Sequence, residues 1–202
     1  MISKKGMATA VFATLLCTGL AHASSFNNTA GLTGLVPSFT TETFDGVSVP
    51  NDTLAGNLFA GVTFDGNTHV TNQYSGSFAN FVGIALTNFF PCCAAQTMFT
   101  FANPVSAVGF SLVTNPGVTT FTAELGGNVV ESFSAPTSTS GSVNFYGFTG
   151  ITFDSIQINA GGYNNAYAMD NLQVAAVPES ETYAMLLAGL GLLGFMTRRK
   201  AS

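Results

Sequence analysis

Few residues of this chain could carry catalytic chemistry, and their types favour binding over catalysis. After the first 23 residues the only imidazole is His69, which follows Asn67 and Thr68 without a recognisable partner for a nucleophile. Nucleophilic catalysis needs such a base beside the nucleophile. Two carboxylates would suffice for a glycoside hydrolase, but no family motif marks a pair. We therefore expect a protein that is not an enzyme, and a secreted glycoside hydrolase is the third-ranked alternative.

Tyrosines offer a second kind of chemistry, because a flat amphipathic ring can stack against a sugar. The chain has no Trp, and Tyr163 and Tyr167 are close together in the segment Gly-Gly-Tyr-Asn-Asn-Ala-Tyr, residues 161–167. The two Asn side chains between them supply amide donors and acceptors. This loop is a candidate glycan contact, and the alternative is an ordinary polar turn with its Tyr rings packed at the edge.

Charge is distributed unevenly, with every Lys and Arg close to a terminus. Residues 24–177 contain eight Asp and Glu and no Lys or Arg, which gives this segment a net charge of −8. Nucleic-acid binding is thereby disfavoured, because its affinity comes mostly from cations that meet phosphates. A buried carboxylate in this segment needs backbone donors, a raised pKa or a metal ion, since no Lys or Arg is present to pair with it.

The elements that must position these residues are short strands between about residues 39 and 174. Apolar runs alternate there with clusters of Gly, Asn, Pro, Ser and Thr, and the period of two predicts nine or ten strands with no helix. Turns are indicated at Asn115-Pro116-Gly117, Gly126-Gly127-Asn128 and Gly161-Gly162. A bulge is indicated near Asp154. The expected core positions are Phe99, Phe101, Val108, Phe110, Leu112, Phe121, Ala123, Leu125, Ile151, Phe153, Ile156, Ile158, Leu172 and Val174.

The first 23 residues have the pattern of a secretory signal peptide. Lys4 and Lys5 precede the apolar run of residues 7–20, and Ala21-His22-Ala23 is a cleavage site of the A-x-A type. Signal peptidase is expected to cut after Ala23, so that the mature chain begins at Ser24. The alternative is a buried N-terminal helix.

Cys92 and Cys93 are the only cysteines left after this cut. Export brings them into an oxidising compartment, where disulfides form. Adjacent cysteines close a strained ring, and strained bonds are more easily reduced. A vicinal disulfide is one prediction for this pair, and two free thiols or intermolecular bridges are the alternatives.

The C-terminal segment has three parts in a fixed order. Val177-Pro178-Glu179-Ser180 precedes the apolar run of residues 183–196, which is followed by Arg198-Arg199-Lys200. Fourteen helical residues reach only about 21 Å, short of a hydrocarbon core of about 30 Å. This short helix therefore suits transient retention, and its basic tip should stay cytoplasmic. The domain before it would then face the periplasm.

These three parts resemble the PEP-CTERM sorting signal of Gram-negative bacteria, in which a Val-Pro-Glu-Pro motif, a short apolar helix and an Arg-rich tip follow one another. The resemblance implies that an exosortase, a membrane transpeptidase, removes the tail and passes the protein to the cell surface or extracellular matrix. Ser180 stands where the family has its second Pro. The alternative is an ordinary C-terminal membrane helix.

The stretches 150–158 and 168–174 look like the last two strands of PEP-CTERM jelly-roll domains, which resemble carbohydrate-binding modules. The expected fold is therefore all-β: a jelly-roll-like antiparallel sandwich of two sheets at 24–176, between the signal helix at 1–23 and the sorting tail at 177–202. Many such domains hold a structural Ca²⁺ between an acid on the first strand and an Asp on the last. The resemblance places Glu42 or Asp45, and Asp170, at those positions. Solvated acids at strand ends are the alternative.

Together these features predict an exported surface or matrix protein that is structural and associated with exopolysaccharide. A dedicated carbohydrate-binding module is the alternative function.

Overall fold

The computed structural model describes residues 24–89, 96–141, 143–177 and 188–190. Ten strands and one 3₁₀ helix, η1 (Tyr163–Asn165), form between residues 24 and 177 of these segments, and residues 188–190 are helical. The strands are β1 (Ser24–Asn28), β2 (Thr40–Glu42), β3 (Val62–Phe64), β4 (His69–Thr71), β5 (Ala85–Thr87), β6 (Thr97–Thr114), β7 (Gly117–Leu125), β8 (Asn128–Thr137), β9 (Phe145–Asn159) and β10 (Tyr167–Ala176). The all-β fold is as predicted, and the signal peptide and most of the C-terminal helix lie outside the described residues.

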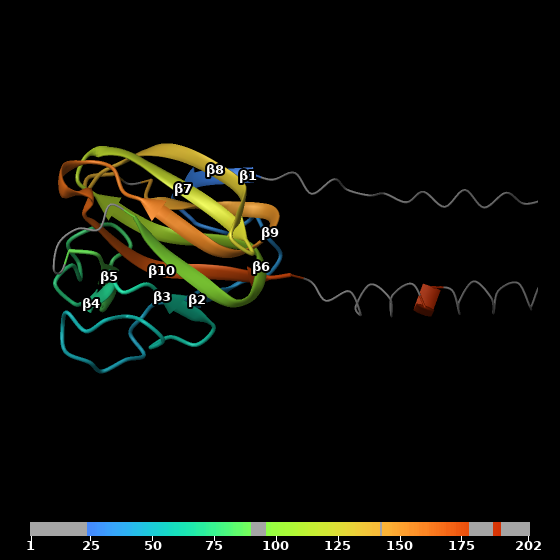
Figure 1. Cartoon of the computed structure of the whole chain (residues 1–202), viewed down its shortest axis with the longest axis horizontal. Coiled ribbons are helices and arrows are strands. Elements are labelled where there is room, and N and C mark those ends of the chain that lie inside the picture. The colour runs from blue at the N-terminus through green and yellow to red at the C-terminus, as the bar shows by residue number, and fades with distance from the viewer. Residues whose placement is uncertain (1–23, 90–95, 142, 178–187, 191–202) are drawn as a thin grey trace, which may run out of the picture.

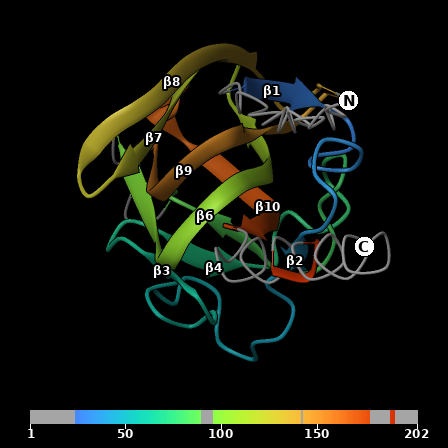
Figure 2. The same cartoon turned by 90° about the vertical axis from the view of Figure 1, so that its right-hand side faces the viewer.

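The ten strands pair antiparallel in one continuous sheet (Figure 1). The sheet is arranged in two layers because the two long strands, β6 and β9, each contribute to both. One layer runs β8, β7, the end of β9, the start of β6 and β3. The other runs β4, β5, β10, the rest of β6, the start of β9 and β1, with β2 also beside β10. β6 lies between β9 and β10 in the sheet and pairs with both, and the three strands can be followed in Figure 2. The predicted two-sheet sandwich therefore exists as two layers that share strands.

The strands change layer where their register is irregular. Extra residues occur on β6 between Thr100 and Val105, and on β9 between Thr149 and Phe153. Bulges bend and twist a strand, so these two allow β6 and β9 to contribute to both layers. The bulge predicted near Asp154 is adjacent to these irregularities, since Asp154 lies between Phe153 and Ser155, opposite the extra residues of β6.

Aromatic rings fill the space between the layers. Phe121 lies at the centre, with its ring centroid 5.9 Å from Phe110, 5.0 Å from Phe133 and 5.0 Å from Tyr146. Most predicted core positions are buried as expected from period-two alternation. The exceptions are Leu125, which is exposed, and the partly buried Ile151 and Val174.

The layer that contains β10 is buried on both faces. Tyr167 and Met169 point into the core between the layers, while Ala168 packs on the outer face with Phe81 and Val113. A second outer cluster joins Leu32, Ala107 and Ala175. Loops therefore cover this outer face at two places, which simple alternation of apolar and polar residues does not predict.

The first residue of the domain and the end of β10 are connected by a series of residue pairs across neighbouring strands. Ser24 pairs with Thr149, Thr149 with Ala107, and Ala107 with Ala175. Three strand spacings of about 4.8 Å separate the ends of this series by about 14 Å. Both ends of the domain are thus at the same end of the sandwich, as the start of β1 and the end of β10 show in Figure 1.

Replacing Phe121 with Ala should lower the free energy of unfolding by about 3–5 kcal/mol, because the cavity left among three rings cannot close. Urea denaturation followed by fluorescence or circular dichroism measures this change. Val129→Ala, at an exposed position on β8, is the matched control and should change stability by less than about 0.5 kcal/mol. Equal effects for the two variants would contradict the placement of Phe121 at the centre of the core.

Candidate functional sites at the two ends of the sandwich

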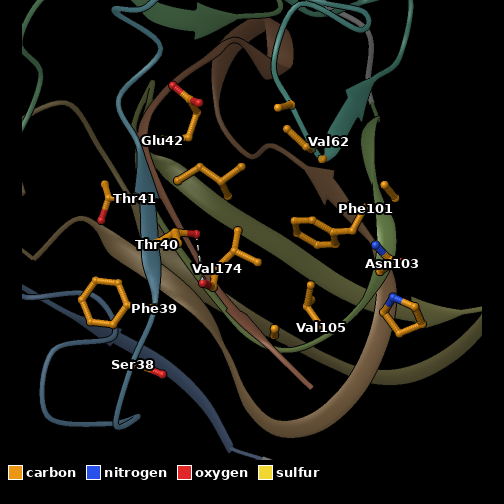
Figure 3. A pocket seen from close by; sticks show the side chains of 16 residues that line it. Ser38, Phe39, Thr40, Thr41, Glu42, Val62, Phe101, Asn103, Val105 and Val174 are labelled. Carbon is orange, nitrogen blue, oxygen red and sulfur yellow. Dashed lines mark hydrogen bonds between the residues drawn. The ribbon is translucent and has the colours of Figure 1, made fainter. Parts of the chain in front are cut away.

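A groove of about 500 Å³ opens at the end of the sandwich where β10 stops. We call it the β2–β10 groove. It is lined by Ser38, Phe39, Thr40, Thr41, Glu42, Ala60, Gly61, Val62, Phe101, Ala102, Asn103, Pro104, Val105, Leu172, Val174 and Ala176. In Figure 3, Phe101 and Val105 face Thr40 and Val174 across it. The hydroxyl of Thr40 donates a 3.4 Å hydrogen bond to the carbonyl of Val174, which ties β2 to β10.

The lining of this groove has an apolar floor and a rim of neutral polar groups. Glu42 is its one acid, and its Oε1 accepts a 2.8 Å hydrogen bond from the backbone N–H of Phe44. No Lys or Arg occurs anywhere in residues 24–177. The groove can therefore hold apolar groups and exchange hydrogen bonds, but it has no cation to hold a phosphate or carboxylate.

A smaller pocket of about 150 Å³ lies at the opposite end of the sandwich. We call it the aromatic pocket. Its lining residues are Tyr74, Phe78, Phe89, Val113, Thr114, Asn115, Thr139, Ala166, Tyr167 and Ala168. Tyr74 and Phe78 have ring centroids 5.7 Å apart, and Phe78 meets Phe81 edge-on at 5.7 Å. Thr114 ends β6 and pairs with Tyr167, which starts β10, so this pocket lies far from Ala176.

The two tyrosines predicted to contact glycan have different environments. Tyr163 is 78 % exposed on η1, and its carbonyl accepts a 2.8 Å hydrogen bond from the Asn115 side chain. Tyr167 is only 5 % exposed, and its hydroxyl lies 3.3 Å from that of Thr68. Burial raises the pKa of Tyr167 to about 12. The strand that follows η1 turns its first side chain, that of Tyr167, toward the core, so only Tyr163 of the two predicted contacts is exposed.

Sequence reasoning missed the aromatic pocket. Tyr74, Phe78 and Phe89 come from a segment without regular alternation, so their placement beside η1 follows from tertiary packing alone. The nearest sequence signal is the abundance of aromatic residues between 74 and 90, which does not reveal where the rings point.

Asp170 is a buried carboxylate on the outer face of β10. It is 1 % exposed, and its oxygens accept hydrogen bonds from the backbone N–H groups of Asn171 at 2.6 Å and Val82 at 3.1 Å. Burial raises the pKa of Asp170 to about 7, against the lowering effect of these bonds, and the charge of Asp45 adds to the increase. Asp45 itself accepts a 2.7 Å bond from the N–H of Ile84.

The residues predicted to bind calcium fit such an ion only in part. Asp45 and Asp170 lie close enough for their charges to interact, whereas Glu42 lines the β2–β10 groove and Asp45 lines a different cavity. Within the described segments, no three Asp, Glu, His or Cys side chains form a metal-binding group. Ser111, opposite Asp170 on β6, is fully buried, and its hydroxyl has no hydrogen-bond partner among the described residues. Calcium takes six to eight oxygens, so Asp45, Asp170 and the Ser111 hydroxyl would form only part of its shell.

The other predicted site residues are only partly visible. Cys92 and Cys93, the cleavage residues Ala21 and Ala23, and the tail residues Pro178, Glu179, Arg198, Arg199 and Lys200 lie outside the described residues. Ser24 begins β1, and Val177 is exposed directly after β10. His69 is buried, with Nδ1 2.9 Å from the carbonyl oxygen of Asp52, which is a structural contact.

A family model of the PEP-CTERM protein-sorting motif matches residues 176–200. The chain carries a PEP-CTERM sorting motif. This confirms the resemblance seen in the sequence, and it implies an exported protein that is held transiently at the inner membrane and processed by an exosortase. The helical residues that the structure describes include no segment long and apolar enough to cross a membrane.

Solved structures similar to this chain include two carbohydrate-binding modules and one catalytic domain. TmCBM61, in complex with beta-1,4-galactotriose, is 14% identical, with 57% of this chain and 87% of that one covered and a TM-score of 0.33. CBM32 of AlyQ, in complex with 4,5-unsaturated mannuronic acid, is 14% identical, with 64% and 100% covered and a TM-score of 0.32. The catalytic domain of a GH87 alpha-1,3-glucanase is 12% identical, with 60% and 27% covered and a TM-score of 0.36. No curated protein matches the chain.

The raised pKa of Asp170 predicts a pH dependence of stability. A carboxyl with a higher pKa in the folded than in the unfolded state holds its proton more tightly when folded, so stability is lost as pH rises. The loss should extend from about pH 4 to the folded-state pKa of about 7. Thermal unfolding of the protein in metal-free buffer from pH 4 to 8 measures this loss of stability.

Asp170→Asn is the control for this pH dependence. The amide keeps one acceptor and removes the titration, so the decline of melting temperature between pH 4 and 7 should become shallower. An unchanged slope would show that Asp170 is not its source.

Calcium binding at Asp45 and Asp170 remains a prediction, and chelation at pH 8 is its test. An ion bound only by the folded state at a hundredfold excess over its Kd adds about 2.7 kcal/mol of stability. Chelator should therefore lower the melting temperature, and Asp45→Asn should remove this effect. Glu42→Gln is the matched control, since Glu42 lies in the β2–β10 groove. If chelator leaves the melting temperature unchanged, this domain binds no structural calcium.

Proposed function

We propose that the mature domain is a non-catalytic surface or matrix protein that associates with exopolysaccharide through the aromatic pocket and Tyr163. The observation that carries this proposal is the position of these rings at the end of the sandwich opposite both ends of the domain. Tyr167 and Ala176 are the first and last residues of β10, and nine residue steps of strand span about 30 Å. A domain retained through its tail would thus present the aromatic end outward.

The chemistry of this end suits a neutral sugar. Tyr74 and Phe78 form an apolar wall, and Asn115 and Thr139 offer neutral hydrogen-bonding groups. Asn115 also connects the pocket to the exposed Tyr163, through its hydrogen bond to the Tyr163 carbonyl. Sugar rings stack on such aromatic faces while their hydroxyls exchange hydrogen bonds. The net charge of −8 on residues 24–177 would oppose an anionic polymer unless a cation bridges the two.

The arrangement of carboxylates supports binding without catalysis. Glycoside hydrolases place two carboxylates about 5–9.5 Å apart across the scissile bond. The β2–β10 groove has Glu42 as its one acid, and the aromatic pocket has none. A glycosidase mechanism would need one more acid in the groove and two in the aromatic pocket.

Tyr163→Ala should weaken binding of the mature domain, residues 24–177, to exopolysaccharide from the producing cells by about tenfold, the equivalent of about 1.4 kcal/mol. Tyr163 is largely exposed, so the substitution removes a stacking surface without opening the core. Co-sedimentation or calorimetry measures the affinity, with a neutral glucan and a uronic-acid polymer as defined probes.

Val129→Ala is the matched control, because Val129 is comparably exposed on β8, away from the aromatic pocket. It should bind as the unmodified domain does. Equal affinity of the Tyr163→Ala variant, or release of shortened polysaccharide, would overturn the proposed function.

A further inference from the structure

The sorting motif begins inside the folded domain. The family match starts at residue 176, and Ala176 is also the last residue of β10, where it pairs with Val105. The hydroxyl of Ser106 donates hydrogen bonds to the carbonyls of Ala175 at 3.2 Å and Ala176 at 2.8 Å. β10 is therefore hydrogen-bonded up to its last residue, and no linker separates the folded domain from the start of the motif.

An enzyme that grips this motif must approach the domain closely. Pro178 and Glu179 follow Ala176 by two and three residues, and an extended chain covers at most about 3.6 Å per residue. The motif's Glu is thus within about 11 Å of the strand end. A protein that encloses these residues in an active site has to meet the surface around Ala176.

The concave part of that surface is the β2–β10 groove, because Val174 and Ala176 belong to its lining. Its exposed rim includes Ser38, Asn103 and Pro104, and Figure 3 shows Ser38 and Asn103 at opposite sides of the cavity. The floor is apolar, and Glu42 is the one charge in the lining. An apolar side chain flanked by hydrogen-bond donors would fit there, while an acidic segment would be repelled.

We infer that the β2–β10 groove is a docking surface for the exosortase during processing of the tail. The absence of a linker fixes the enzyme against this end of the sandwich, and the groove lies at the point where the motif leaves the fold. Recognition would then depend on the folded domain as well as on the motif. A protein in which β10 has not yet paired with β6 would be a poor substrate.

The test uses the full chain in cells that contain the exosortase, with the fraction of tail removed followed by pulse-chase labelling. Asn103→Arg places a long cation at the groove rim and should slow processing by about tenfold. Asn159→Arg is the matched control, an exposed Asn at the far end of β9, and should process at the wild-type rate. Ser38→Arg is a second rim variant and should act as Asn103→Arg does.

A variant with a flexible insertion between the domain and the motif distinguishes two possibilities: the domain helps the exosortase to bind, or it only obstructs the enzyme. About ten Gly and Ser residues between Ala176 and Val177 lower the effective concentration of the groove at the active site. Docking predicts slower processing of this insertion variant and a smaller penalty for Asn103→Arg within it. Melting temperatures of the purified variants equal to wild type confirm that each is folded.

Wild-type processing of both rim variants would overturn the inference, and so would faster processing after the insertion, which would mean that the domain only obstructs the enzyme. Glycan binding by the mature domain is measured separately. Failure of the proposed function therefore leaves this result unaffected.

Discussion

The acids of this domain have no Lys or Arg to pair with, and the structure meets this constraint with backbone N–H groups. Asp65 accepts from Met98, Asp154 from Gly126, Asp45 from Ile84 and Asp170 from Val82, each across more than 25 residues of chain. Hydrogen bonds from N–H groups to a carboxylate are stronger than neutral ones. Three of these contacts join a loop or turn to a strand, and the contact of Asp45 with Ile84 joins two loops. Ion pairs often have this role in more highly charged proteins.

These contacts explain how loops can cover the outer face of β10. Asp170 holds the loop at Val82, and the side chain of Gln173 accepts a 2.6 Å hydrogen bond from the N–H of Leu32 in the other covering segment. Gly31, at φ +61°, leaves room for Gln173, since a Cβ there would meet its Oε1. The aromatic pocket is shaped partly by the first of these loops, through Tyr74 and Phe78.

The sequence predicts the parts of this structure that repeat along the chain. Alternation in β6 and β9 identifies the central core, and Gly126-Gly127 marks a turn in which both residues have positive φ. It does not predict positions that depend on non-local packing. Tyr163 and Tyr167 look equivalent in sequence, yet only the first is exposed. Phe78 and Phe81 lack a strand period, and the burial that shifts the pKa of Asp170 comes from a loop some 88 residues away.

Topology alone gives the domain its two distinct ends. β1 is antiparallel to β9, β9 to β6, and β6 to β10. Three successive antiparallel pairings make β10 antiparallel to β1. The start of β1 therefore lies at the same end of the sheet as the end of β10. No side chain is needed for this result, and substitutions that keep the pairing will preserve it. With this strand order, Ser24 and Ala176 lie at one end of the sandwich, and the exposed Tyr163 lies toward the other end.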